Sequence, residues 1–403
     1  MPLPVKVACP LVSFRLVRAN RAFGALALAR VVSLTGDSLS LVALMLLVAD
    51  RAGDALAVAL LLLVGDFAPA LLGPFTGALA DRFDLRRVMI AAEVVQGGLV
   101  LGIALTLPPL PVLLVLVALR AVAGQVFLPA SRAAVPALVA DRDLPAANAA
   151  LGFGANAGEV LGPLVAAALV GVIGVPGVLV VDAVSFGVSA LLLLAVPSLR
   201  PAPADGGLLG SARAGVRFMW SHKAVRVLAL GFCAVVACNG VDDVALVFLA
   251  HDTFGAGDPA VALLLAAVGI GLLAGYALLG PLGARVPMPV LLIAGFAVSS
   301  AGNLLTGLSW AVAAAFTVQT VRGLGIAAMD VATNTLLPRL VPETMLGRVF
   351  GNLYGAIGVA AALSYVGGSV LLDRTSAPVT LVVAGGLGLL ATVATAAGLR
   401  GRT

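Results

Sequence analysis

Eight acidic side chains lie within long apolar stretches of the sequence, where an isolated charge is costly. Only Arg30, Arg120 and Arg322 offer a basic partner in the same stretches, so at least five of the acids lack one. A carboxyl group buried without a partner charge favours its neutral form and takes up a proton. These residue types therefore predict reversible proton binding in an apolar interior. The eight acids are Asp37, Asp66, Glu93, Glu159, Asp182, Asp242, Asp243 and Asp330.

We assign roles to these groups from their depth within the apolar stretches. We assign proton coupling to Asp37, Arg120 and Glu159, with Glu159 and Arg120 as the leading pair. We interpret Asp182 and Asp330 as structural, because they lie nearer helix contacts. A structural hydrogen-bonding role is the alternative for each of the other acids as well. The residues expected to line a cavity for a small amphipathic or cationic substrate are Arg30, Asp66, Asn239, Asp242 and Asp243.

The elements that carry these residues are predicted to be membrane-spanning helices. Hydrophobic residues make up 61% of the chain and charged residues 11%, whereas a soluble domain usually carries about 25% charged residues. A bilayer core needs about 20 helical residues, and its lack of hydrogen-bond partners favours helices. The sequence thus predicts an all-α polytopic membrane protein with twelve spans. These occupy residues 23–49, 55–80, 88–107, 110–131, 149–171, 175–197, 227–250, 260–282, 288–308, 311–335, 349–372 and 377–398.

The basic residues give the expected orientation. Of the 24 Lys and Arg residues, 19 fall in the two tails and in loops on one side of the predicted spans, including Arg132, and only Arg51 and Arg374 fall on the other side. Positive charge marks cytosolic loops, so both termini are expected in the cytosol, and the N-terminal segment is interpreted as a tail and not as a signal peptide. Basic loops facing anionic lipid account for the pI of 9.6, so membrane lipid is expected as a partner and nucleic acid is not.

The predicted spans divide into two similar halves. Residues 198–226, rich in Pro and Gly and then basic, are predicted to be a cytosolic linker with a short interfacial helix. They separate an N-terminal six-helix bundle, residues 1–197, from a C-terminal six-helix bundle, residues 227–403. An offset of 202 residues aligns the halves, which predicts pseudo-symmetry. The aligned pairs include Arg120 with Arg322, Pro136 with Pro338, Asp141 with Glu343 and Leu144 with Leu346.

The loop between the second and third predicted spans reads GALADRFDLRR. Gly77 permits close helix approach, and Asp81 can cap a helix or pair with Arg82 or Arg86. Together with Arg87, these residues are predicted to latch one conformation of the cytosolic face. The alternative is a solvated run of charges.

Two further motifs lie within spans. Arg120 stands between Leu116 and Gly124, and an arginine at membrane depth is functional by default, unless it forms a structural pair with a neighbouring helix. The fifth span carries GEVLGP. Its Gly158 and Gly162 allow close packing, and Pro163 is expected to bend the helix.

These motifs resemble those of the major facilitator superfamily. The loop is similar to the signature GxLaDrxGrRxxl, with Asp84 in place of the second glycine, and Arg120 is similar to a motif arginine linked to proton movement. The fifth span resembles the GxxxGP motif of antiporter branches. The stretch LPASRAAVPALV followed by LPAANA resembles the drug:H⁺ antiporter branch of macrolide, tetracycline and siderophore exporters. Glu93 and Gln96 stand where that branch often carries Asp and Arg.

The resemblance implies the major facilitator fold and a proton-coupled secondary exporter of drugs or natural products that works by alternating access. It further implies a monomer in the bacterial inner membrane, with the substrate and protons as partners and with no cofactor or metal. A siderophore exporter or a solute-uptake facilitator of the same superfamily is the alternative. A non-transporting scaffold is disfavoured because it has little use for intramembrane acids.

Other functions lack their motifs. An ATP-driven pump needs a GxxxxGK[ST] loop, but the two lysines, Lys6 and Lys223, follow Val5 and His222. No HExxH motif is present, and His222 and His251 are far apart in the sequence, so neither a metalloprotease nor a histidine metal site is expected. The protein is not expected to be an enzyme.

Overall fold

The computed structural model describes residues 16–52, 60–61, 64–65, 72, 76, 82–200, 208–256, 258–282 and 285–400. All regular elements in these ranges are helices. Within the described part of the chain, nine helices are long and apolar enough to cross a membrane. Most of the second predicted span, residues 55–80, lies outside the described residues.

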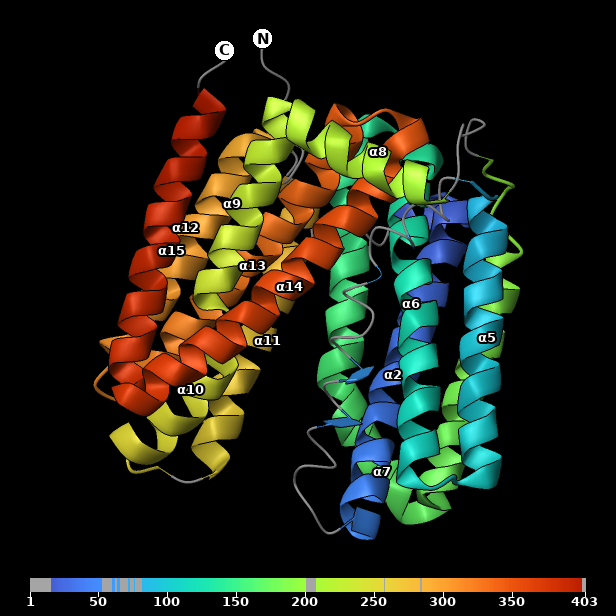
Figure 1. Ribbon diagram of the computed structural model, residues 1–403, viewed down its shortest axis with the longest axis horizontal. Helices are drawn as coiled ribbons and strands as arrows, with labels where there is room; N and C mark the ends of the chain where they lie inside the picture. The colour runs from blue at the N-terminus through green and yellow to red at the C-terminus, as the bar shows by residue number, and fades with distance from the viewer. Residues whose placement is uncertain are drawn as a thin grey trace.

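The first bundle is formed by the N-terminal helices (Figure 1). Its described members are α2 (Arg21–Ala52), α5 (Leu85–Thr106), α6 (Leu110–Leu138) and α7 (Leu144–Leu193). Asp84 caps α5 by accepting a hydrogen bond from the backbone N–H of Arg87. The helix α7 is interrupted at Gly174, whose φ of 69° is readily adopted only by glycine. This interruption falls between the predicted fifth and sixth spans.

The second bundle lies beside the first (Figure 1). Its members are α9 (Lys223–Asn239), α10 (Asp242–Phe248), η2 (Leu249–Thr253), α11 (Asp258–Leu282), α12 (Met288–Gly307), α13 (Val312–Leu340), α14 (Leu346–Arg374) and α15 (Ala377–Arg400). The predicted seventh span is therefore broken at Gly240 and Val241 into α9 and α10.

Helix boundaries recur between the bundles at the offset found in the sequence. Both α6 and α13 have 29 residues, and Val312 follows Leu110 by 202 positions. Both α7 and α14 begin after a short 3-10 turn, at Leu144 and at Leu346, again 202 positions apart. The domain boundaries 1–197, 198–226 and 227–403 stay a prediction.

The helix α8 (Leu208–Ser221) crosses one end of the molecule, which we call the α8 end, and α15 ends on the same side (Figure 1). There, Gly215 of α8 packs against Arg348 and Asn352 of α14. One apolar core at the α8 end joins both bundles and includes Leu26 and Phe350.

Away from the α8 end, the described apolar core separates into two clusters. One contains residues of the first bundle, such as Leu44 and Phe186. The other contains residues of the second bundle, such as Leu264 and Leu381. Since burial of apolar surface is the main favourable term in packing, the two bundles are held together chiefly at the α8 end.

Candidate functional site

Arg120 of α6 binds two acids of neighbouring helices in the first bundle. Its Nη1 atom lies 2.5 Å from Oδ1 of Asp37 on α2 and 3.7 Å from Oδ2 of Asp182 on α7. It also donates a hydrogen bond of 3.3 Å to Ser40. The carboxyl group of Asp182 is fully buried, whereas the side chain of Asp37 is 28% exposed. Asp37 is therefore the member of this group that reaches water.

Glu93 of α5 is a third acid next to these two. It is completely buried, and it lies close enough to Asp37 and Asp182 to feel their charge. The hydroxyl groups of Ser33 and Ser189 lie beside it, but neither carboxyl oxygen makes a hydrogen bond of normal geometry to a described residue. We call Asp37, Glu93, Arg120 and Asp182 the acid cluster. One guanidinium group cannot compensate three carboxylates, of which those of Glu93 and Asp182 are fully buried, so full ionisation of all three acids is costly.

Glycines let α7 approach α2 at this level. Gly158 lies against Thr35 and Gly162 lies against Ser38, two residues of α2 that flank Asp37 in sequence. In the structure these glycines act in close helix packing. The residue with non-helical torsion angles in α7 is instead Gly174. The helix is therefore interrupted at Gly174 and not at the bend predicted for Pro163. The side chain of Pro163 lies outside the described residues.

A buried ion pair lies among the described residues of the second bundle, and we call it the paired site. Arg322 of α13 forms an ion pair with Asp242 of α10, and their side chains are 5% and 7% exposed. Arg322 also donates a hydrogen bond of 3.3 Å to Gln319. The positive and negative charges balance, so proton uptake is not required at this place.

Two other predicted cavity residues lie near the paired site. Asn239 is buried and donates a hydrogen bond of 3.0 Å to Ser300, while Asn303 donates one to it at 3.0 Å. Asp243 is exposed and accepts a hydrogen bond of 3.4 Å from Tyr365. In this conformation Asn239 and Asp242 contact partners in their own bundle, and only Asp243 of the three is open to a substrate.

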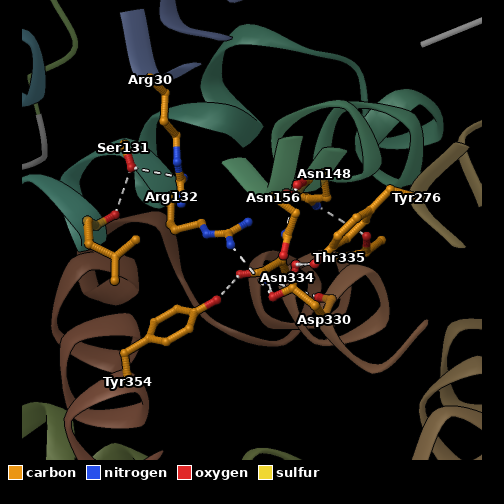
Figure 2. A network of polar contacts seen from close by, with 12 residues as sticks. Arg30, Ser131, Arg132, Asn148, Asn156, Tyr276, Asp330, Asn334, Thr335 and Tyr354 are labelled. Carbon is orange, nitrogen blue, oxygen red and sulfur yellow. Dashed lines mark hydrogen bonds and ion pairs between the residues drawn. The ribbon is translucent and has the colours of Figure 1, made fainter. Parts of the chain in front are cut away.

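A group of polar contacts connects the two bundles toward the α8 end (Figure 2). Arg132 of α6 lies 3.6 Å from Asp330 of α13, and Tyr276 of α11 donates a hydrogen bond of 3.2 Å to the same carboxylate. Asn148 of α7 donates one of 3.2 Å to Thr335 of α13. We call this group the bridging network. Its members are Arg30, Ser131, Arg132, Asn148, Tyr276, Asp330, Asn334, Thr335 and Tyr354.

One arginine of the bridging network corrects an expectation drawn from the sequence, and another is placed by the structure. Arg30, expected in the substrate cavity, is buried and its Nη1 donates a hydrogen bond of 3.4 Å to Ser131, and its role in a cavity stays a prediction. Arg132 was counted among the loop residues. The helix α6 continues beyond its apolar run to Leu138, so Arg132 is a buried helical residue with an acidic partner in the opposite bundle.

The described part of the predicted latch connects α5 to the chain that follows α7. Arg86 donates a hydrogen bond of 3.3 Å to the carbonyl oxygen of Val196, and Ser198 donates one to Asp84. Burial alone would raise the pKa of Asp84, but the hydrogen bonds from Ser198 and from the Arg87 N–H outweigh it and lower that pKa. Arg82 and Arg87 are exposed. Gly77 and Asp81 lie outside the described residues.

A hollow of about 770 Å³ lies beside this latch, between α5 and α6. Its walls are mainly apolar, with Val88, Val95 and Val126 among them, and Arg87 and Arg200 stand at its rim. It is distinct from the acid cluster, because none of the four cluster residues lines it.

The remaining predicted residues cannot be placed in a site. Asp66 lies outside the described residues, and Glu159 lies on α7 with its side chain outside them. The pairing of Glu159 with Arg120 therefore stays a prediction, while the described partners of Arg120 are Asp37 and Asp182. Among the described residues, no group of three His, Cys, Asp or Glu side chains could hold a metal ion.

Sequence reasoning did not bring two members of the acid cluster together. Asp182 was interpreted as structural, and Glu93 was counted among the eight acids without a role of its own. Their position in apolar stretches was the available signal. The approach of Asp182 to Arg120, and of Glu93 to Asp37 and Asp182, comes from the packing of the helices, which hydropathy does not reveal.

Comparison with known proteins identifies relatives over nearly the whole chain. The family profile described as Major Facilitator Superfamily matches residues 26–251 and 238–402. The uncharacterized MFS-type transporter YfiS of Bacillus subtilis is 24% identical over 389 residues, which cover 92% of this chain and 91% of that protein. Macrolide efflux protein A of Streptococcus pyogenes is 25% identical over 207 residues, covering 49% of this chain and 51% of that protein.

A solved structure shares the fold. The crystal structure of a bacterial homologue of the iron transporter ferroportin, in an outward-facing state, matches with a TM-score of 0.79 at 19% sequence identity. The match covers 94% of this chain and 99% of that chain. The helical architecture described above is therefore one that solved transporters adopt.

Proposed function

The chain belongs to the Major Facilitator Superfamily, and we propose that it is a proton-coupled exporter of small amphipathic or cationic compounds. The family and fold are those of multi-pass membrane transporters and not of enzymes. The observation that carries the proposal is the acid cluster, in which Arg120 binds Asp37 and Asp182 and a third acid, Glu93, lies beside those two. A carrier that only exchanged neutral solutes would have no use for this excess of acids at membrane depth.

Protonation of the acid cluster weakens a specific contact. When Asp37 takes up a proton, it loses its ionic attraction to Arg120 and keeps only a weaker hydrogen bond, so Arg120 turns to the remaining carboxylate of Asp182. Asp37 lies on α2 and Asp182 lies on α7. When Arg120 exchanges one acid for the other, the ionic contact of α6 therefore moves from α2 to α7. Proton binding is thereby converted into a change in helix packing.

The helices α2 and α6 carry this change to the bridging network. Arg120 and Arg132 are twelve residues apart on α6, which at 1.5 Å per residue is about 18 Å. Asp37 and Arg30 are seven residues apart on α2, or about 10 Å. Both helices thus link the proton site with the contacts between the bundles. Alternating access follows if proton release at the acid cluster favours closure of the α8 end.

The conformation and the orientation are part of the proposal. The joint apolar core at the α8 end and the separate cores beyond it support a state closed at the α8 end and open at the other. The excess of basic residues at the tails and on this side supports placing the α8 end and both termini in the cytosol. The protein would then lie in a bacterial inner membrane with its substrate path open to the outside.

The cargo is inferred from charge and from relatives. The acid cluster has net negative charge when ionised, which favours cationic compounds. A relative over half of the chain is named as a macrolide efflux protein. The proposed partners are the substrate, protons and membrane lipid, whose anionic headgroups suit the arginine rim of the hollow at α5 and α6. We propose that the monomer is the working unit.

Efflux from proteoliposomes under an imposed pH gradient tests the proposal, with ethidium and erythromycin as probe compounds. We expect the gradient to drive transport by the wild type and by Asp143→Asn, a control that removes an exposed acid. Asp37→Asn and Glu159→Gln should lose the gradient-driven component while still inserting and folding. Proton-independent uptake of a nutrient by the wild type would overturn the proposal.

A further inference from the structure

The bridging network contains more buried positive charge than negative charge. Arg30 and Arg132 are each only 7% exposed. The described carboxylate that acts on both of them is that of Asp330, which lies 3.6 Å from Arg132. The other described titratable groups that act on the two arginines are the phenols of Tyr276 and Tyr354. Among the described side chains, two guanidinium groups therefore share one carboxylate in an interior of low dielectric.

The donors of the two arginines are largely unused. A guanidinium group has five N–H donors, yet the Nε and Nη1 atoms of Arg132 have no hydrogen-bond partner among the described residues. Arg30 makes one long hydrogen bond, of 3.4 Å, to Ser131. Arg132 also lies over the ring of Tyr354, 5.8 Å from its centroid, but a ring offers no hydrogen-bond acceptor of ordinary strength.

The two side chains converge at the contact between the bundles. Figure 2 shows Arg30 extending from α2 toward Arg132, which in turn points at Asp330 of the second bundle. The charges of the two arginines act on each other, so their repulsion is relieved when a second negative group joins them. A carboxylate or a phosphate matches the planar fork of a guanidinium group.

We propose that Arg30 and Arg132 form a binding site for one anionic group, either a small inorganic anion or the carboxylate of an organic compound. The anion competes with Asp330 for Arg132. This inference rests on the proposed function in one respect, because separation of the bundles during alternating access is what opens the site to water. The anion would fill the site when the α8 end is open, and Asp330 would displace the anion when the α8 end closes.

Thermal unfolding of the purified full chain tests the site without any transport or pH gradient. Sodium chloride, sodium phosphate and sodium benzoate are each titrated at matched ionic strength into the wild type and into the double variant Arg30→Gln/Arg132→Gln, which serves as the reference for a general salt effect. A ligand that binds the folded state raises the unfolding midpoint in a saturable manner. We expect such a rise in the wild type with at least one of the three probes. A wild type that shows no saturable rise with any of them overturns the proposal.

Variants distinguish a specific anion-binding site from a general effect of salt on stability. Arg30→Gln and Arg132→Gln each remove a charge-assisted contact and should weaken anion binding about tenfold or more. Asp330→Asn removes the competitor and should strengthen it in the same assay. Arg339→Gln is the matched control, since it breaks the exposed contact of 2.8 Å to Asp141 that also connects the bundles, and should leave anion binding unchanged. Equal binding by all four variants overturns the proposal.

The probes also identify the source of the anion. Saturation by chloride or phosphate at lower concentration than by benzoate assigns the site to a free inorganic anion. Saturation by benzoate alone assigns it to the carboxylate of an organic compound. Asp330→Asn keeps the test decisive if an arginine variant fails to fold, because unchanged or weaker binding by Asp330→Asn contradicts the competition. Loss of gradient-driven efflux in the earlier assay leaves this result unaffected, so the two proposals fail separately.

Discussion

Arg120 of α6 and Arg322 of α13 occupy matching positions, 202 residues apart, in helices of equal length. Arg120 pairs with Asp37 of α2, and Arg322 pairs with Asp242 of α10. The two sites differ in what else is present. Arg120 has a second acid, Asp182, within 3.7 Å, and Glu93 lies buried beside both acids. Among the described residues, by contrast, Asp242 is the one acid that pairs with Arg322, and its neighbour Asp243 is exposed.

The repeat shows that the additional acids of the first bundle have no acidic counterpart in the second. The positions 202 residues after Glu93 and Asp182 hold Gly295 and Ala384, which cannot ionise. Amide and hydroxyl groups, including those of Gln319, surround the paired site instead. A balanced buried pair is costly to break, while an excess of acids exchanges protons readily. The comparison teaches that the partners of an arginine, and not its position in the repeat, separate a structural site from a proton site.

The largest expected effect on stability is that of Arg322→Gln. It leaves Asp242 buried without a compensating charge, which should lower the free energy of unfolding by about 3–5 kcal/mol. Arg120→Gln should cost clearly less, because Asp37 reaches water and the acids of the cluster can take up protons. Thermal or denaturant unfolding of the purified variants at neutral pH measures both. Equal destabilisation by the two substitutions would remove the distinction between the sites.

The double variant Asp242→Asn/Arg322→Gln should regain most of the stability that Arg322→Gln loses. No unpaired charge remains, and the two amides can hydrogen-bond in the place of the ions. A double-mutant cycle on unfolding free energies measures this coupling. Additive losses from the two single substitutions would mean that the ion pair is not the source of the effect.

Glu93→Gln should change stability by only about 1 kcal/mol, because it keeps the shape of a side chain that has no cationic partner of its own. Its effect should appear in the pH profile. Without the Glu93 carboxyl group the cluster has one proton-binding group fewer, so the pH dependence of gradient-driven efflux should become less steep. Efflux rates at a series of external pH values measure this slope, and a profile identical to that of the wild type would place Glu93 outside the proton-binding group.

The smallest effect is expected for Arg339→Gln. The contact between Arg339 and Asp141 connects the bundles, but both side chains are well exposed, and pairs of this kind contribute about 0–1 kcal/mol. Unfolding measurements at low and high salt should give nearly equal values for this variant and the wild type. A loss as large as that of Arg322→Gln would show that burial does not set the strength of these pairs.

Much of the architecture was accessible from the sequence. The fold class, the resemblance to the superfamily and the offset between the halves rest on hydropathy and on motifs, and both are local properties of the chain. The break in α7 at Gly174 also falls where the apolar runs divide. These features are readable because lipid imposes a fixed length and a helical backbone on each span.

The chemistry of the site was less accessible. Depth in the membrane put Asp37, Arg120 and Glu159 in one proposed functional group, but it predicted neither the ion pair of Asp37 with Arg120 nor the approach of Asp182, far along the chain, to the same guanidinium group. These contacts depend on which face of a helix meets which neighbour, and that is decided by packing of the whole bundle. Arg132 was assigned to a loop because the apolar run ends before it, although α6 continues to Leu138; hydropathy does not mark such a polar extension of a helix.

The central claim is that the acid cluster, and not the paired site, couples transport to protons. The most direct test compares Asp37→Asn with Asp242→Asn in proteoliposomes that contain equal amounts of folded protein, with the ratio of ethidium efflux in the presence and absence of a pH gradient as the readout. The account predicts a ratio of one for Asp37→Asn and a ratio near that of the wild type for Asp242→Asn. Ethidium efflux by Asp37→Asn that the gradient stimulates would contradict the account. So would efflux by a folded Asp242→Asn variant that the gradient does not stimulate.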